Sequence, residues 1–372
     1  MGQLPVRRNF SLFFLFFFFF FFFSFFCAAS SFNLSVISFD QGYTHLFGEG
    51  NLVRSSDGRS VRLLLDRYTG KLHLKPFQLY EIFCSFKLYF NFWKSSGSGF
   101  ISANLYKHGF FSANIKLPSE YTAGVVVAFY TSNGDVFEKT HDELDFEFLG
   151  NVKGKPWRFQ TNVYGNGSTS RGREERYRLW FDPSKEFHRY SILWTAKNII
   201  FYVDEVPIRE VIRNEAMGGD YPSKPMSLYA TIWDASNWAT SGGKYKVDYN
   251  YAPFVSEFSD FVLDGCPADP LQLASAAGCS DKDAELESND YSAITPLRRI
   301  SMRKFRQKYM YYSYCYDTLR YATPPPECVI IPSEKRRFQD TGRLKFGGSH
   351  KKSSKRRSRV PVATTSDRQA AA

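Results

Sequence analysis

The sequence predicts an all-β fold, a jelly-roll sandwich of two sheets, followed by a small C-terminal α/β extension. Three observations support this prediction. Between residues 32 and 262, apolar residues occur in short runs, and each run is bounded by Gly, Pro, Asn, Asp or Ser. Long stretches with helical periodicity are missing from this region. Regularly spaced short strands with turn residues between them are typical of sandwiches and jelly rolls.

The individual elements follow from these runs. We expect strands at VRLLLD (61–66), GFFSANIKL (109–117), GVVVAFYTS (124–132), ELDFEFLG (143–150), RFQTNVY (158–164), HRYSILWT (188–195) and IIFYVDEVPI (199–208). NEAMGGDYPSKP (214–225) is expected to be a loop. In the extension, 280–287 and 293–317 have helical character, and we expect no order after about residue 332.

The first 29 residues have the order of a secretory signal peptide. Arg7 and Arg8 precede a long run of Phe, and small residues follow it up to Ala29, the expected cleavage point. The alternative is an uncleaved membrane anchor, but roughly 17 apolar residues are marginal for crossing a bilayer. We therefore expect an exported protein, in which disulfides are permitted.

Four of the six cysteines lie late in the chain, and an even set in an exported protein suggests two bridges. Three connectivities are possible from the sequence. We prefer the local pairs, in which Cys266 joins Cys279 and Cys315 joins Cys328. The jelly-roll domain is then expected at 30–262, and the extension that carries both disulfides at 263–332.

The net charge of +11 is concentrated at the C-terminus. From residue 333 onward, 12 Lys and Arg stand against 3 Asp and Glu, so the rest of the chain is nearly neutral. We expect residues 333–372 to form a basic, disordered tail. No aromatic residues interleave with the charges of its run KKSSKRRSR (351–359) and the chain is expected to be exported, so we predict no nucleic-acid partner. The tail either contacts anionic polymers electrostatically or is simply solvated.

Residues 71–97 differ from everything around them. This segment is dense in Phe, Tyr and Lys without a clean period. If it is removed, the flanks join as DRYTGSGFISANLY, which predicts a strand, a tight turn and a strand. Our hypothesis is that 71–97 is a retained intron or a gene-model error. The alternative is a genuine, elaborated hairpin, in which Cys84 is an unpaired thiol.

The segment HDELDFEFLG, residues 141–150, carries the functional signal. Strand periodicity places Glu143, Asp145 and Glu147 on one face and the intervening apolar residues on the other. Asp142 does not fit this alternation. An exposed strand with a solvated acidic face would explain the acids, but the apolar face indicates that the strand is interior.

Paired carboxylates are the minimum apparatus for cleaving a glycosidic bond, and retaining enzymes hold them about 5–5.5 Å apart. Glu143 and Glu147 must lean towards Asp145 across a concave sheet to approach one another. Crowding of like charges raises the pKa of at least one of them, as a proton donor requires. His141 either tunes the acids or caps the strand. No second His lies nearby, so we predict no metal site.

The segment resembles the active-site strand of plant xyloglucan endotransglucosylase/hydrolases, in glycoside hydrolase family 16. The resemblance extends through QTNVY, GREERYRLWFDP, HRYSILW, SLYATIWDASNWAT and YSYCYDTLRY…PPEC, and covers most of residues 35–332. It implies that Glu143 is the nucleophile, that Glu147 is the general acid and base, and that Asp145 orients the nucleophile. It implies no cofactor.

The resemblance also implies a set of substrate contacts. These are Gln160, Thr161, Asn162, Arg173, Glu174, Trp233, Asn237, Trp238, Gly242 and Arg320. Two positions depart from the family pattern: Gly172 stands where relatives often have Asn or Asp, and Asn237 where they usually have Asp. A core role is the alternative for Trp233, and a surface ion pair is the alternative for Arg320.

The sequon NGS at Asn166 predicts a glycan beside the site, and NLS at Asn33 is a second, weaker sequon. The usual sequon after the acidic strand is missing here, as in the long-tailed subgroup of the family. That subgroup favours a secreted, monomeric wall enzyme that cuts the xyloglucan backbone with retention and passes it to a xyloglucan acceptor. Its basic tail would meet anionic wall polymers such as pectate. A β-glucan hydrolase and a non-catalytic wall-binding protein are the alternatives.

Overall fold

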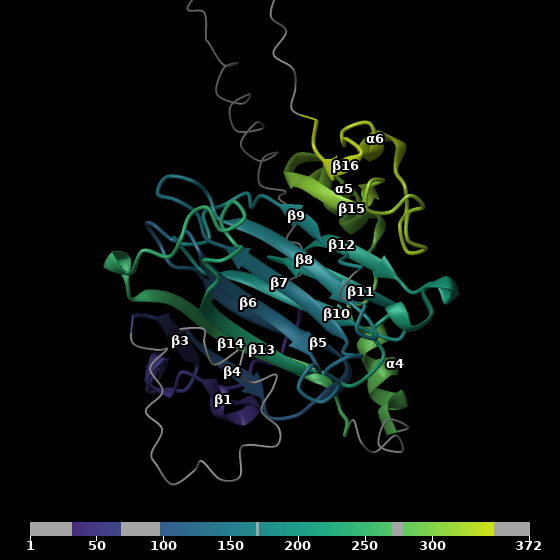
Figure 1. Ribbon diagram of the computed structural model, residues 1–372. Coiled ribbons are helices and arrows are strands. Elements are labelled where there is room, and N and C mark those ends of the chain that lie inside the picture. Colours follow the sequence, from purple (N-terminus) through teal and green to yellow (C-terminus); the bar gives the residue numbers. More distant parts are fainter. Residues whose placement is uncertain (1–31, 68–96, 169–170, 270–277, 346–372) are drawn as a thin grey trace, which may run out of the picture.

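The computed structural model describes residues 32–67, 97–168, 171–269 and 278–345 (Figure 1). It confirms the all-β sandwich with a C-terminal extension. The nine-stranded sheet has the order β1 (Tyr43–Phe47), β4 (Gly97–Ser102), β13 (Ser227–Asp234), β6 (Val125–Ser132), β7 (Glu143–Leu149), β8 (Arg158–Tyr164), β9 (Glu175–Tyr177), β15 (Met310–Asp317) and β16 (Thr341–Arg343). The seven-stranded sheet has the order β12 (Val206–Ile212), β11 (Asn198–Val203), β10 (His188–Trp194), β5 (Tyr106–Lys116), β14 (Phe254–Pro267), β3 (Ser60–Leu65) and β2 (Leu52–Arg54).

The few helices lie at the edges and ends of these sheets. They are α2 (Phe39–Gly42), α4 (Ser280–Ser288), α5 (Pro296–Tyr309) and α6 (Pro332–Lys335), with short 3-10 turns η1 (Glu49–Asn51), η2 (Glu215–Asp220) and η3 (Tyr249–Tyr251). Of the described helices, none is long and apolar enough to cross a bilayer. The expected signal peptide, residues 1–29, lies outside the described residues.

The core forms where the two sheets face one another, because alternate residues of each strand point inward. Phe146 of β7 illustrates this packing: its ring stacks on Phe159 of β8 and meets Phe201 of β11 and Tyr190 of β10 edge-on, with centroids 5.2 to 5.8 Å apart. Aromatic rings thus fill the space between the sheets and fix which face of β7 is buried. The opposite face of the nine-stranded sheet carries the three acids, and we call it the acidic face.

One strand prediction is corrected by the structure. IIFYVDEVPI is not one strand but the hairpin of β11 and β12, in which Val203 pairs with Val206. Asp204 and Glu205 both have positive φ, at 47° and 62°. Such a turn usually contains Asn-Gly or Asp-Gly, and the sequence Asp-Glu concealed it.

The strand, tight turn and strand expected around 71–97 apply to a chain without this segment, so they stay a prediction. β3 and β4 belong to different sheets, so the chain crosses from one sheet to the other between them. The strands meet through Ser98, whose hydroxyl accepts a 3.0 Å hydrogen bond from the amide of Leu64 and donates one of 2.9 Å to its carbonyl. The intron hypothesis itself concerns residues outside the described part of the chain, except for Gly97, which begins β4.

The C-terminal extension differs from its prediction in three ways. The predicted helical segment 293–317 divides into α5 and then β15, which joins the nine-stranded sheet. β14 continues to Pro267, so the expected domain boundary at 262 falls within a strand. Order does not stop near residue 332, because α6 and β16 follow; residues 346–372 lie outside the described part.

Both preferred disulfides are present. Cys266 and Cys279 have Cα atoms 5.6 Å apart, and the bridge ties the end of β14 to the residue that precedes α4. Cys315 and Cys328 have Cα atoms 5.5 Å apart, and this bridge ties β15 to the segment that leads towards α6. Each closes a short loop, as the local pairing predicted.

Candidate active site

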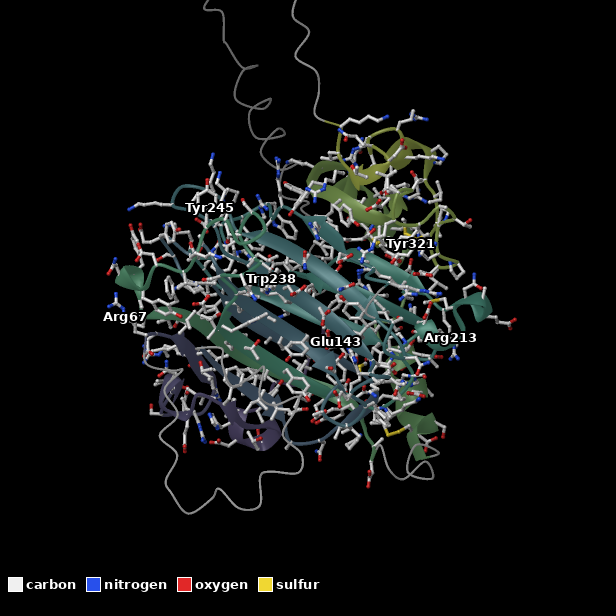
Figure 2. All side chains as sticks on the ribbon, viewed as in Figure 1. Arg67, Glu143, Arg213, Trp238, Tyr245 and Tyr321 are labelled. Atoms are coloured by element: carbon white, nitrogen blue, oxygen red, sulfur yellow. A yellow bond between two sulfur atoms is a disulfide. The ribbon has the colours of Figure 1, made fainter. Side chains whose placement is uncertain are left out.

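The three predicted acids share the acidic face at the middle of the nine-stranded sheet, where Figure 2 labels Glu143. Asp145 is 5% exposed, while Glu143 and Glu147 are half-buried. The residues between them, Leu144, Phe146 and Phe148, are fully buried on the core face. The strand is therefore interior, and the interpretation as a merely solvated acidic face does not hold.

Neighbouring strands surround the acids with mostly polar side chains. Strand register places Ser132, Tyr130 and Ala128 of β6 opposite Glu143, Asp145 and Glu147, and places Tyr164, Asn162 and Gln160 of β8 on their other side. The Gln160 amide donates a 2.6 Å hydrogen bond to Glu147 Oε2. The carboxyls of Asp145 and Glu143 also share a hydrogen bond. The three acids thus form one row, in which Asp145 bonds to Glu143 and Gln160 bonds to Glu147.

Burial raises the pKa of every acid in the row. The pKa of Glu143 rises to about 7, since desolvation and the charge of Glu147 outweigh the hydrogen bonds from Ser132 and Asp145. Desolvation and two carboxylate neighbours raise the pKa of Asp145 well above its ordinary range. Asp145 is therefore the member that holds a proton and donates it in the hydrogen bond to Glu143.

The pKa of Glu147 is raised as well. Desolvation is the largest cause, the hydrogen bond from Gln160 opposes it, and the charge of Glu174 adds to it. An acid that stays protonated towards neutral pH is suited to donating a proton to a leaving oxygen. The row thus combines a proton donor with a carboxyl that can ionise.

Thr161 does not belong to the binding set, which corrects its prediction. It lies opposite Phe146 on the core face and is fully buried. Arg209 of β12 donates hydrogen bonds of 3.0 and 3.1 Å to its hydroxyl and carbonyl oxygens. The positive charge of this buried arginine lowers the pKa of Asp145 against the larger effects that raise it. Thr161 therefore anchors a cation beneath the acid row.

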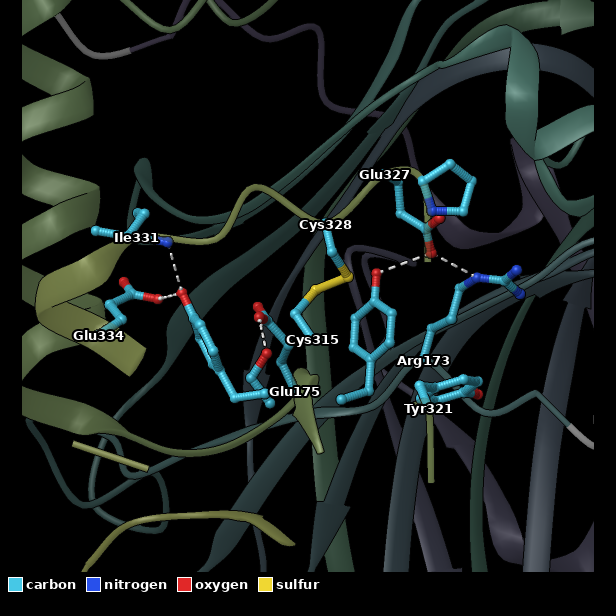
Figure 3. The surroundings of a disulfide bond; sticks show 12 residues. Arg173, Glu175, Cys315, Tyr321, Glu327, Cys328, Ile331 and Glu334 are labelled. Atoms are coloured by element: carbon cyan, nitrogen blue, oxygen red, sulfur yellow. Dashed lines mark hydrogen bonds and ion pairs between the residues drawn. A yellow bond between two sulfur atoms is a disulfide. The ribbon is translucent and has the colours of Figure 1, made fainter. Parts of the chain in front are cut away.

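Arg173 is also misassigned as a substrate contact. Its side chain is 2% exposed and is held by Glu327 at 2.7 Å and Asp220 at 2.6 Å. Its backbone amide donates to Asn162 Oδ1 at 2.9 Å. Figure 3 shows Arg173 and Glu327 beside the Cys315–Cys328 bridge. Arg173 therefore fastens the extension to the sheet.

Glu174 and Arg320 form an ion pair of 2.6 Å between the sheet and the extension. Gly172 allows this pair, because a Cβ there would lie 2.5 Å from Arg320 Nη2 and 2.7 Å from Glu174 Oε1. The family's Asn or Asp has a Cβ that would crowd this ion pair, and Gly172 avoids the crowding. The surface ion pair considered for Arg320 is present, and its partner is another predicted site residue.

The tryptophans lie on the side of the acidic face towards β13. Trp233 pairs with Val126, which pairs with Leu149, so Trp233 and Leu149 lie on the same face. The ring centroid of Trp233 is 5.9 Å from that of Trp238. Trp238 is 38% exposed, and Trp233 is half-buried against a small apolar cluster. Asn237 and Gly242 are exposed in the same loop, and Gly242 has a φ of +68°.

Asp142, the acid that broke the alternation, is a buried structural centre that we did not predict. It accepts hydrogen bonds of 2.7 to 2.8 Å from the amides of Asn166, Ser223 and Lys224, and Lys224 Nζ lies at 2.9 Å. It therefore holds two loops at the end of β7. Its lack of fit to the strand pattern was the available signal.

A buried ion network was also missed. Arg306 of α5 pairs with Glu175 of β9 at 2.6 Å and with Glu334 of α6 at 3.0 Å. The charges of Arg306 and Arg209 lower the pKa of Glu175 to about 2, although burial alone would raise it. Glu334 also accepts a hydrogen bond from Tyr316 (Figure 3). This network explains why order continues past residue 332.

His141 lies beside Tyr164, with ring centroids 6.3 Å apart, and its Nδ1 is buried without a hydrogen-bond partner. Asn166 is exposed in the turn after β8. Within the described ranges, no group of three or more His, Cys, Asp or Glu residues is placed to hold a metal ion.

Two family patterns match the chain. "Glycosyl hydrolases family 16" matches residues 39–251, and "Xyloglucan endo-transglycosylase (XET) C-terminus" matches residues 281–328. Among curated relatives, the probable xyloglucan endotransglucosylase/hydrolase protein 30 of Arabidopsis thaliana is 66% identical over 88% of this chain and 87% of its own length. Protein 29 of the same organism is 62% identical over 89% of this chain and 88% of its own. The chain therefore belongs to the xyloglucan endotransglucosylase/hydrolases of glycosyl hydrolase family 16.

Proposed function

We propose that this protein cleaves the β-1,4-glucan backbone of xyloglucan with retention and transfers the glycosyl unit to another xyloglucan chain. The observation that carries the proposal is the row of three acids on one face of β7, in which all three pKa values are raised and Glu143 and Glu147 are partly exposed. Family membership and the C-terminal extension support xyloglucan as donor and acceptor.

In the first half-reaction, Glu143 attacks the anomeric carbon as a carboxylate while Glu147 donates its proton to the leaving glycosidic oxygen. Asp145, protonated, donates a hydrogen bond to Glu143 and so favours its charged form. In the second half-reaction, Glu147 accepts a proton from the incoming hydroxyl, which attacks the glycosyl-enzyme and frees Glu143. Transfer and hydrolysis differ only in whether a sugar hydroxyl or water arrives.

We assign substrate contacts to those predicted residues that lie on or beside the acidic face. Gln160 and Asn162 flank the acids, Trp233, Asn237, Trp238 and Gly242 lie towards β13, and Glu174 and Arg320 lie towards the extension. We further propose export to the apoplast and wall, a glycan on the exposed Asn166, and a monomeric state. In the wall, the enzyme would be surrounded by wall polymers.

Incubation with xyloglucan and a labelled xyloglucan oligosaccharide tests the proposal. Label should enter polymer with the wild-type protein, and Glu143→Gln should reduce incorporation by roughly a thousandfold or more because the nucleophile is lost. The matched control is Glu138→Gln, an exposed acid outside the row, which should leave incorporation unchanged. New reducing ends without incorporation would replace transfer with hydrolysis, and no turnover at all would favour a binding protein.

A further inference from the structure

An unpaired group of arginines lies at the extension side of the acidic face. Strand register forms a continuous row that starts at Glu147 and runs through Gln160 of β8, Arg176 of β9 and Tyr312 of β15 to Arg343 of β16. The guanidinium carbon of Arg176 lies 4.9 Å from the centroid of the Tyr312 ring. The row therefore leads from the proposed acid to a basic, aromatic edge.

Two more arginines join this edge. Arg158 is two residues before Gln160 on β8 and so shares its face, and Arg178 follows Arg176 by two residues. Both are exposed, as is Arg343, while Arg176 is half-buried. The charges of all four act on Tyr311, whose pKa is raised by burial and lowered by each of these arginines. We call Arg158, Arg176, Arg178 and Arg343, with Tyr311 and Tyr312, the arginine edge.

The arginine edge differs from the other arginine sites at this end of the sheet. Arg173, Arg306 and Arg320 each form an ion pair with a carboxylate. By contrast, none of the four edge arginines forms an ion pair with any residue that the structure describes, and Arg176 Nε is buried without a hydrogen-bond partner. Asp317 of the neighbouring β15 already accepts the Tyr312 hydroxyl at 3.0 Å and the Arg320 amide at 3.1 Å.

The charge of Arg176 acts on Glu147, but none of the four arginines has an ion-paired carboxylate in the described part of the chain. Gathering like charges without ion pairs costs free energy, which an anionic ligand would recover. Guanidinium groups bind carboxylates through two parallel hydrogen bonds, and tyrosine rings offer flat apolar surfaces beside them. The edge spans the four adjacent strands from β8 to β16, roughly 14 Å at the usual strand spacing. An extended chain with repeated carboxylates matches this span better than a single small anion.

We propose that the arginine edge is a binding site for a uronosyl-bearing, carboxylated sugar chain. The acidic face leads directly to it, so the chain would lie end to end with the glycan at the acids. β16 lies beyond residues 281–328, the part of the extension that the family pattern matches. The site concerns binding alone and stands whether or not the protein transfers xyloglucan.

Calorimetric titration of the full-length protein with a hexamer of α-1,4-linked galacturonic acid tests the site. The double variant Arg158→Gln/Arg343→Gln should bind about tenfold more weakly, equivalent to about 1.4 kcal/mol. The matched control is Arg59→Gln/Arg62→Gln, which removes two charges from β3 and the turn before it, in the other sheet. The basic C-terminal tail is present in every protein compared, so only the arginine edge differs.

The methyl-esterified hexamer and a nucleic-acid oligomer of equal charge complete the design. The esterified hexamer should lose most of the binding, and the nucleic acid should bind the two double variants equally. The proposal is overturned if wild type does not bind the hexamer, or if the control variant loses as much affinity as the edge variant. It is also overturned if the nucleic acid discriminates between the variants as strongly as the hexamer, because the edge would then respond to charge alone.

Discussion

Replacement of Asp145 by Ala should move the acidic limb of the pH–activity profile to higher pH. Asp145 donates a hydrogen bond that favours the charged form of Glu143, whose pKa is about 7. Hydrogen bonds to charged groups contribute about 1.5–3 kcal/mol, and one pKa unit corresponds to about 1.4 kcal/mol. Loss of the donor should therefore raise the pKa of Glu143 by about one to two units.

The sign follows from the role of the nucleophile. Glu143 attacks only when deprotonated, so kcat/KM falls as the pH drops through its pKa in the free enzyme. A higher pKa shifts this fall towards alkaline pH, and activity two units below the wild-type midpoint should drop a further roughly 10- to 100-fold. The assay is kcat/KM for label transfer into xyloglucan, measured from about pH 4 to 9.

Asp145→Asn is the matched control for this experiment. The amide retains an N–H donor of nearly the same shape, so the acidic limb should stay within about half a unit of wild type. Thermal unfolding of both variants separates the pH effect from loss of folding. An Asp145→Ala limb that stays in place or moves to lower pH would refute the assigned hydrogen bond, as would an identical shift in Asp145→Asn.

Three further results are expected. Gln160→Leu removes the donor that lowers the pKa of Glu147, so the alkaline limb should move up by about one unit; a downward shift contradicts this. Arg306→Met removes the ion-pair partner of buried Glu334 and leaves Glu175 with Arg209 alone, so it should reduce the free energy of unfolding in urea by about 3–5 kcal/mol; a loss below about 1 kcal/mol would contradict the ion network. Replacing both Cys315 and Cys328 by Ser should reduce stability by about 2–4 kcal/mol, and an unchanged melting temperature would show that the bridge adds nothing.

Strand alternation predicted the central feature of the site. The apolar residues between the acids fixed which side of β7 is buried, so Glu143, Asp145 and Glu147 could be placed on one face without coordinates. The same rule excludes Thr161, which lies between Gln160 and Asn162. The family motif QTN includes Thr161, but the period of two places its side chain on the core face.

Other features depend on contacts between distant parts of the chain. Glu175 and Arg306 are separated by 131 residues, and Arg173 and Glu327 by 154. A charged residue in an isolated sequence is expected at the surface, because burial requires a partner. Local patterns contain no information about such a partner, so Arg173 was expected to contact substrate and no role was predicted for Glu175, Arg306 or Glu327. The ordered segment beyond residue 332 was missed for the same reason.

These buried charges connect the extension to the acid row. Glu334 and Glu175 both bind Arg306, Glu175 lies 3.9 Å from Arg209, and the charge of Arg209 acts on the pKa of Asp145. Charges alternate in sign along this path, so each buried group is compensated by the next. If the extension were absent, Glu175 would keep only Arg209 as a partner. Arg209 would then be drawn towards Glu175 and away from the acid row. The extension therefore contributes to the electrostatics of the acid row as well as to the length of the sheet.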